Sequence, residues 1–271
     1  MSVATPVGAL LSFTIVLYLL SSLAPVPTLL RREQRGTLLA PAFAGAGLIA
    51  HMSAIVLGGI AAGRCPVVNR YEIMSLLSWL IVLFYLIVYA RSRMQVLSVI
   101  LPPLSLVVLV TSNLLDFLLP EGPLPLTAAQ QGTLFVLHVT IAVLSVAALC
   151  LTFALSAIYV LQDRLLKNKQ HGSWLRVLPP LDRCDRLVYR SLILGFPLLT
   201  LGIVSGSVLH ATRSGHFWAW RGDELFALVA WSILAVVIVA RLTRGWRGRR
   251  SAYLTIAGFV AGVLTMVSMY L

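Results

Sequence analysis

The stretch "LHVTIAVLSVAALCLTFALSAIYVLQ", residues 137–162, contains no Lys, Arg, Asp or Glu side chain. A helix of roughly 20 apolar residues is long enough to cross the hydrocarbon core of a bilayer. This stretch exceeds that length, and its one histidine lies next to its beginning. The residues therefore predict a membrane-spanning helix.

Eight apolar runs of about this length follow one another along the chain. They lie near residues 6–30, 37–61, 72–90, 96–117, 132–161, 190–210, 224–240 and 252–271. The composition agrees, because 59% of the 271 residues are hydrophobic and 11% are charged, whereas a soluble domain carries about 25% charged residues. We predict an all-α, polytopic membrane helical bundle of about eight transmembrane helices, organised as a single domain over residues 1–271.

The basic residues are distributed unevenly among the connections between these runs. All but four of the 21 Lys and Arg residues fall in alternate connections, which share one side of the membrane. These connections are 31–36, 91–95, 162–190 and 241–250. The exceptions are Arg64, Arg70, Arg213 and Arg221. Because an excess of Lys and Arg marks the cytoplasmic face, we predict both termini on the outer, periplasmic side of a bacterial cytoplasmic (inner) membrane.

Several classes of protein are disfavoured by the same sequence. The net charge of +12 follows from this topology and favours contact with the lipid bilayer, so we predict no nucleic-acid partner. Cys65, Cys150 and Cys184 lie far apart and form no CxxC or CxxCH motif, so the chain is not itself a c-type cytochrome. The interiors of the predicted helices contain no Lys, Arg, Asp or Glu, which argues against an ion-coupled transporter.

Two histidines interrupt the apolar runs. His51 lies near the midplane, on the outer half of its run, and His138 lies about 9 Å below the outer surface at about 1.5 Å per residue. One interpretation is that each histidine hydrogen-bonds to Ser or Thr across helices. The other is that they share a ligand, because imidazole binds metal ions and haem iron and is readily kept neutral when buried.

The connection "SGHFWAWRGDE" (214–224) carries unusual side chains for a short link between membrane helices. Its tryptophans, Trp218 and Trp220, fit either the interfacial aromatic belt or a platform for a planar, apolar macrocycle. In the second interpretation, an arginine pairs with a carboxylate edge of the macrocycle. The candidates for this contact are Arg213 and Arg221, and two further histidines lie at the same level, His210 and His216.

These stretches resemble the cytochrome c assembly family, which includes CcsA-, HemX- and YpjD-like membrane proteins. The resemblance rests on the histidine-led helix 137–162 and on four more stretches. They are "PVVNRYEIMSLLSW" (66–79), "GFPLLTLGIVSGSVL" (195–209), "GHFWAWRGDELFALVAW" (215–231) and "GWRGRRSAYLTIAGF" (245–259). In the family's tryptophan-rich outer loop, Gly215, Trp218, Trp220 and Glu224 match, whereas Ser214 and Arg221 depart from the pattern.

The resemblance implies haem b as the cofactor and assigns it a set of contacts. It implies that His138 is an axial ligand of the haem iron, with Trp218 and Trp220 as the platform. It also implies that Arg221 or Arg213 contacts a propionate.

Two histidines of full haem lyases in this family have no counterpart. The outer histidine after the last helix is absent, and the inner histidine aligns with about Val239. His51 is therefore the expected second ligand of the iron, and His210 and His216 are the alternatives. On this basis the chain is not expected to be a complete haem lyase by itself.

The resulting function hypothesis is a haem-binding integral membrane protein of cytochrome c biogenesis. It would hold or present haem at the outer membrane face, with apocytochrome c and a second biogenesis subunit as partners. A HemX-like regulator or scaffold is the alternative, acting on haem biosynthesis through a cytoplasmic partner of the basic segment 162–190. A transporter of haem or a small apolar solute is a third hypothesis.

Overall fold

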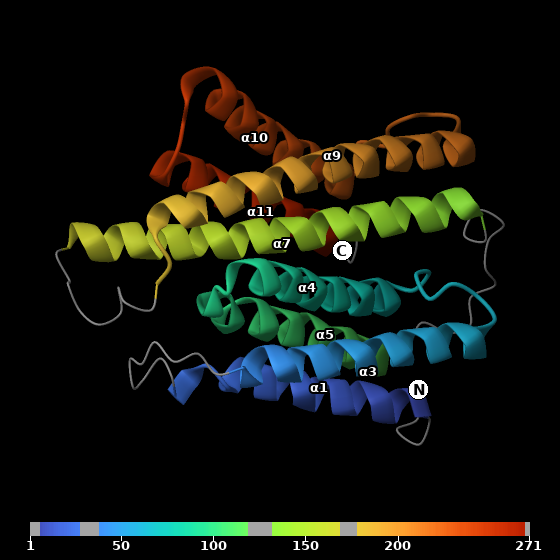
Figure 1. The fold of residues 1–271 in the computed structure, drawn as a ribbon. Coiled ribbons are helices and arrows are strands. Elements are labelled where there is room, and N and C mark those ends of the chain that lie inside the picture. Colours follow the sequence, from blue (N-terminus) through green and yellow to red (C-terminus); the bar gives the residue numbers. More distant parts are fainter. Residues whose placement is uncertain (1–5, 28–37, 119–131, 169–177, 269–271) are drawn as a thin grey trace. The chain divides into compact units, whose positions relative to one another are not determined.

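The computed structural model describes residues 6–27, 38–118, 132–168 and 178–268, and these residues form helices joined by short connections, without a strand. The helices, in chain order, are α1 (Pro6–Leu23), α3 (Leu39–Ala62), α4 (Arg70–Ser92), the 3-10 helix η1 (Gln95–Val99), α5 (Leu101–Leu118), α7 (Thr133–Lys167), α9 (Leu181–Ser214), α10 (Gly222–Arg244) and α11 (Arg249–Ser268). Figure 1 shows their course along the chain.

The prediction of an all-α membrane protein with eight spans is confirmed. In the described ranges, eight helices are long and apolar enough to cross a membrane, with η1 and α5 counted as one span, Gln95–Leu118. The connection predicted over 162–190 is shorter than expected, because α7 continues to Lys167 and α9 begins at Leu181. The placement of both termini on the outer side stays a prediction.

Helix ends follow local sequence signals. Gly215 and Gly245 end α9 and α10 in the left-handed conformation, with φ of 76° and 62°, which costs least for glycine. At the other end, α10 begins with Asp223 and Glu224 in its first turn, where acidic side chains complement the helix dipole. These signals fix the borders of the tryptophan loop, defined here as residues 215–221.

The contacts divide the chain into two compact units, Met1–Gln131 and Gly132–Leu271. In the first unit, α1 packs against α3 and α5, and α4 packs against α3 and α5. Gly47 allows α1 and α3 to approach closely, because a Cβ there would lie 2.6 Å from the Tyr18 ring. The side chains of Ser78 and Ser105 each donate to the other's backbone carbonyl, which links α4 to α5.

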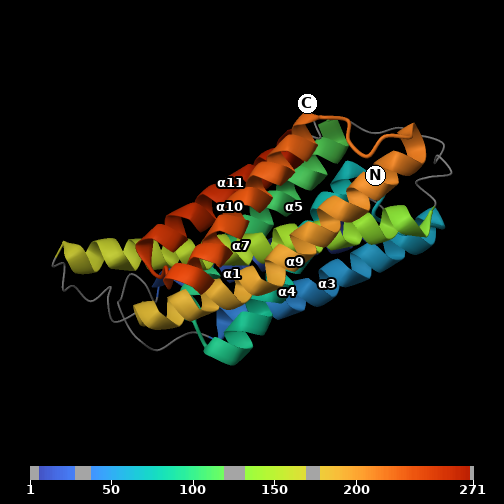
Figure 2. The ribbon, with the colours of Figure 1, turned by 90° about the horizontal axis from the view of Figure 1, so that it is seen from above.

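In the second unit, α7 packs along α9, and α10 lies beside α11, as both views of the ribbon show (Figure 2). Small residues allow the backbones of α7 and α9 to approach. A Cβ on Gly195 would lie 3.2 Å from the Ala148 Cβ, and one on Gly202 would lie 3.5 Å from the Ala142 Cα. This pairing is antiparallel, so the beginning of α7 and the end of α9 lie at the same end of the unit.

A buried ion pair joins α9 to α10 in the second unit. The side chains of Asp185 and Arg241 are 11% and 8% exposed. Arg241 donates to both carboxylate oxygens of Asp185, at 3.1 Å to Oδ1, and the Gly248 amide donates to the same Oδ1 at 3.2 Å. The sequence interpretation placed Arg241 in a connection and assigned Asp185 no partner. The structure places Arg241 in the last turn of α10 and Asp185 near the beginning of α9.

Candidate functional site

His138 lies in the second turn of α7 and faces α9. Its Nδ1 is 3.0 Å from the Ser205 Oγ, and that hydroxyl donates to the Gly202 carbonyl at 3.1 Å. With the Ser205 hydroxyl donating to Gly202, its oxygen can accept a hydrogen bond from His138 Nδ1–H. In the tautomer that makes this bond, the lone pair of the neutral imidazole is on Nε2, for which no hydrogen bond to a described residue is recorded. Metal-bound histidines usually have this arrangement, with the second nitrogen donating to a fixed acceptor.

The space for the His138 ring depends on a glycine. A Cβ on Gly206 would lie 2.9 Å from His138 Cε1 and 3.5 Å from both ring nitrogens. Side-chain atoms at the first distance clash, so any larger residue would displace the imidazole. Gly206 follows Gly202 at a spacing of one helix turn, and the pair forms a close-packing surface toward α7. The half-buried His138 ring thus lies in a position that the α9 backbone defines.

The tryptophan loop presents two indole rings that contact each other in a tilted arrangement. The ring centroids of Trp218 and Trp220 are 6.4 Å apart, with 35° between the ring planes. Trp220 is 71% exposed and has a φ of 56°, in the left-handed region that bulky residues rarely adopt. Such a conformation costs roughly 1–3 kcal/mol and requires surrounding contacts to hold it.

The arginines predicted near this loop have different surroundings. The Arg213 guanidinium lies over the Phe135 ring of α7, 5.6 Å from its centroid, which is within the range of a cation–π contact. Phe135 precedes His138 by one helix turn, so Arg213 and His138 belong to the same α7–α9 contact region. Arg221 donates instead to Asp223 at 3.1 Å, in an ion pair exposed on the surface.

The other two histidines of the second unit lie in the last turns of α9 and in the loop. His210 is half-buried and His216 is exposed. Their imidazoles form no hydrogen bond with the residues that the structure describes. The two carbonyls accept bonds from the Ser214 hydroxyl instead, at 3.0 Å and 3.3 Å. Neither ring nitrogen pair is engaged by a described residue, and the assignment of either histidine to a second axial position stays a prediction.

His51 belongs to the first unit, where it is fully buried and bridges three helices. Its Nδ1 is 3.2 Å from the Tyr18 hydroxyl on α1, and its Nε2 is 2.9 Å from the Ser75 hydroxyl on α4. Both nitrogens are occupied, as expected for a histidine that hydrogen-bonds across helices. Iron ligation by His51 would require one of these bonds to break. Its pairing with His138 as a second ligand stays a prediction.

Removing the Tyr18 hydroxyl should destabilise the first unit. Tyr18→Phe leaves one buried ring nitrogen of His51 without a partner, which costs about 1–3 kcal/mol. We expect a lower thermal midpoint of the detergent-purified protein. The matched control is Ser53→Ala, because the Ser53 hydroxyl is exposed and bonds only to the Ile49 carbonyl of its own helix, at 3.0 Å. An equal midpoint for both variants would show that the bridge contributes nothing.

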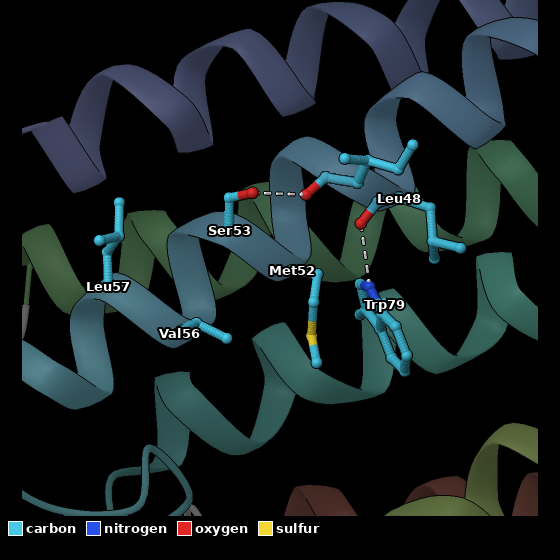
Figure 3. Close-up of a pocket in the computed structure, with 7 residues that line it drawn as sticks. Leu48, Met52, Ser53, Val56, Leu57 and Trp79 are labelled. Carbon is cyan, nitrogen blue, oxygen red and sulfur yellow. Dashed lines mark hydrogen bonds between the residues drawn. The ribbon is translucent and has the colours of Figure 1, made fainter.

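A shallow, open pocket of about 570 Å³ lies between α3 and α4. Its lining is Leu48, Ile49, Met52, Ser53, Val56, Leu57 and Trp79. Figure 3 shows that the Trp79 indole donates to the Leu48 carbonyl, at 3.0 Å, with Met52 beside it. This lining has no charged side chain to pair with a carboxylate. In this respect the pocket differs from the α7–α9 region, where Arg213 lies over Phe135.

Comparison with known proteins identifies the family of this chain. The sequence model described as Cytochrome C assembly protein matches residues 67–271, which include all of the second unit and α4, η1 and α5 of the first. The chain belongs to the cytochrome c assembly protein family. The matched range begins after α3, so it contains His138 and the tryptophan loop but not His51.

Curated relatives from several lineages agree with this membership. The chain is 30% identical over 247 residues to the cytochrome c biogenesis protein CcsA of Prochlorococcus marinus (strain NATL1A), covering 81% of this chain and 78% of the relative. It is 31% identical over 218 residues to CcsA of Mesostigma viride, covering 72% and 70%. It is 32% identical over 204 residues to CcsA of Chlamydomonas reinhardtii, covering 73% and 56%. The protein is thus a multi-pass membrane protein of cytochrome c biogenesis.

Three residues that lie near His138 were not predicted as site residues from the sequence. Ser205 is hydrogen-bonded to the imidazole, Gly202 accepts a bond from that serine, and Gly206 provides space for the ring. The sequence signal that predicts them is the small-residue spacing of Gly202 and Gly206 on the helix that pairs with the histidine-bearing helix. Glu224, at the border of the tryptophan loop, was also not predicted as a site residue. Its Oε2 accepts hydrogen bonds from the Ala219 and Trp220 amides, both at 2.9 Å.

Proposed function

We propose that this protein holds haem b through His138 and presents it at the outer membrane face for attachment to apocytochrome c. The observation that carries the proposal is the hydrogen-bond chain from His138 Nδ1 through Ser205 to the Gly202 carbonyl. When Nδ1–H donates to Ser205, Nε2 is an unprotonated nitrogen of a hydrogen-bonded ring. This nitrogen would bind the haem iron.

The surrounding residues fit a planar macrocycle with carboxylate edges. Arg213 and Arg221 lie at the end of the second unit that carries the tryptophan loop, and both side chains are exposed. They would pair with the propionates, because guanidinium groups bind carboxylates in a forked geometry. Trp218 and Trp220 would cover the apolar ring surface and exclude water. Either His210 or His216 would supply the second axial nitrogen without losing a hydrogen bond, whereas His51 would lose one.

Bound haem would supply the vinyl groups that form thioether bonds with the cysteine thiols of the acceptor. The residues of this chain would bind the cofactor, orient it and limit water access. The excess of Lys and Arg in alternate connections supports the outer placement of the loop and of both termini in a bacterial cytoplasmic membrane. A second biogenesis subunit is proposed as the partner that completes the assembly site.

The proposal is tested by the absorption spectrum of the protein purified in detergent after expression with added haem precursor. We expect a Soret band from stoichiometric haem b, extractable by acid acetone because it is not covalently bound. The pyridine haemochrome spectrum identifies the haem type. A protein that takes up no haem under these conditions would contradict the proposal and would favour a regulatory or scaffold function.

Ser205 should influence haem binding through the His138 proton. Ser205→Ala removes the acceptor for Nδ1–H, so the ring loses both its orientation and its fixed protonation. Loss of such an outer-shell partner typically weakens metal binding by about 10–100-fold, and we expect a decrease in haem affinity of this size in a haem titration. The control is Ser207→Ala, two residues away, whose hydroxyl bonds only to the Ile203 carbonyl of its own helix. Equal affinities for the two variants would show that Ser205 has no such role.

A further inference from the structure

The first turn of α10 carries two acidic side chains with different contacts. Asp223 accepts a hydrogen bond from the Arg221 side chain at 3.1 Å. Glu224 instead reaches back into the tryptophan loop, where its Oε2 accepts bonds from two consecutive backbone amides, Ala219 and Trp220, each at 2.9 Å. One carboxylate thus contacts a side chain, while the other fixes the loop backbone.

The amides that Glu224 binds belong to the strained part of the loop. Trp220 has a φ of 56° although it is not glycine, and a bulky residue keeps this conformation only when its surroundings impose it. Trp220 is 71% exposed, and its recorded ring contact is with Trp218 of the same loop. The Trp220 amide, next to this φ angle, donates a hydrogen bond to Glu224 at 2.9 Å, and this bond acts directly on the backbone.

A second glutamate of the chain provides an internal comparison. Glu72 occupies the same third position of α4 and accepts bonds from the Val68 and Asn69 amides, at 3.0 Å and 3.2 Å. Its carboxylate also binds Arg64 through two hydrogen bonds, at 2.8 Å and 2.9 Å, and this contact raises the pKa of the Arg64 guanidinium. Glu224 has no basic partner among the described residues, so its hydrogen bonds are directed at the loop backbone alone.

We propose that Glu224 is a positioning residue that sets the orientation of Trp218 and Trp220 for haem contact. This inference rests on the proposed function. Glu224 itself would not touch the haem. It holds the backbone amides of Ala219 and Trp220. The position of this backbone determines the direction in which the indole rings of the loop point.

The experiment compares Glu224→Ala with its matched control Asp223→Ala. Both variants remove one negative charge from the first turn of α10, so effects on the helix dipole are shared, but only the first releases the loop amides. The loop is probed without haem by chymotrypsin, which cleaves after aromatic residues, with the cleavage rate at Phe217, Trp218 and Trp220 followed by mass spectrometry. Haem affinity is then measured by titration of the same detergent-purified preparations.

For Glu224→Ala we expect about tenfold faster cleavage in the loop and about tenfold weaker haem binding, since releasing one strained residue has an effect of this order. Asp223→Ala should stay within about twofold of wild type in the cleavage assay, because an exposed ion pair contributes little, and it should not weaken haem binding, because it only releases Arg221. Glu224→Gln should fall between wild type and Glu224→Ala, because the amide oxygen still accepts hydrogen bonds.

The two assays separate failure of this inference from failure of the proposed function. Equal cleavage rates for Glu224→Ala and wild type, or equal effects of the two alanine variants, would overturn the positioning role of Glu224. Absence of haem binding in the wild-type protein would instead overturn the proposed function, whatever the cleavage rates are.

Discussion

Replacing His138 by alanine is expected to abolish haem binding while the membrane protein remains folded. The substitution removes the nitrogen that would bind the iron, and losing a ligand costs more than the roughly 10–100-fold effect of losing an outer-shell partner. We expect haem affinity to fall by more than about 100-fold, and c-type cytochromes to be lost in cells that depend on this protein. The measurements are the Soret absorbance per protein and haem staining of cytochromes after gel electrophoresis.

The control for this prediction is Thr140→Ala on the same helix. Thr140 is exposed, and its hydroxyl bonds only to the Val136 carbonyl of α7, at 2.7 Å. We expect wild-type haem content for this variant. If His138→Ala kept its haem, or if both variants lost it equally, His138 would not be the ligand.

The second large effect is expected at the buried ion pair of the second unit. Asp185→Ala would leave the Arg241 guanidinium buried, with the Asp185 carbonyl at 3.2 Å and the Tyr189 ring at 4.5 Å as its remaining contacts. Removing one partner of a buried pair costs about 3–5 kcal/mol. The Gly248 amide between α10 and α11 would also lose its acceptor. We therefore expect a strongly lowered thermal midpoint and poor recovery of folded protein from membranes.

Two further variants show whether this loss comes from the unpaired charge. Asp182→Ala, one turn earlier on α9, removes an exposed carboxylate paired with Arg186 and should cost less than about 1 kcal/mol. The double variant Asp185→Leu with Arg241→Met replaces both charges with apolar groups, and such replacements are often neutral. Its thermal midpoint should exceed that of Asp185→Ala. A midpoint for Asp185→Ala equal to that of Asp182→Ala would contradict a stabilising role for the pair.

The sequence was sufficient to predict the membrane-spanning helices because the bilayer requires long apolar runs that are visible without tertiary information. The ends of α7 and α9 were predicted less well. Their charged extensions, such as the segment up to Lys167, continue as helix after the apolar run has ended. Hydropathy reports the membrane boundary, whereas the helix end depends on local backbone signals.

The candidate site was predicted in its residue types but not in its contacts. His138 and the tryptophans were recognisable because of their positions in the family pattern. The contacts of Ser205 and Gly206 with His138 depend on the register of α9 against α7, which a single sequence does not specify. The same holds for Asp185 and Arg241, which are 56 residues apart in the chain and meet only after α9 and α10 have packed.

Histidine 51 illustrates why burial of a polar side chain does not by itself identify a ligand. Its position in an apolar run is compatible both with iron binding and with a bridge between helices. The hydrogen bonds to Tyr18 and Ser75 satisfy both ring nitrogens, whereas His138 uses one. The distinction lies in residues on other helices, one of them 33 positions away in the chain.

The central claim is that the imidazole of His138 binds the haem iron, and chemical rescue tests it most directly. His138→Gly leaves a cavity of the size of the ring, and imidazole added to the detergent-purified, haem-supplemented variant would occupy it. We predict a variant without the wild-type Soret spectrum that regains this spectrum as imidazole is titrated, whereas Thr140→Gly is unaffected. A His138→Gly protein with the wild-type haem spectrum in the absence of imidazole would contradict the claim.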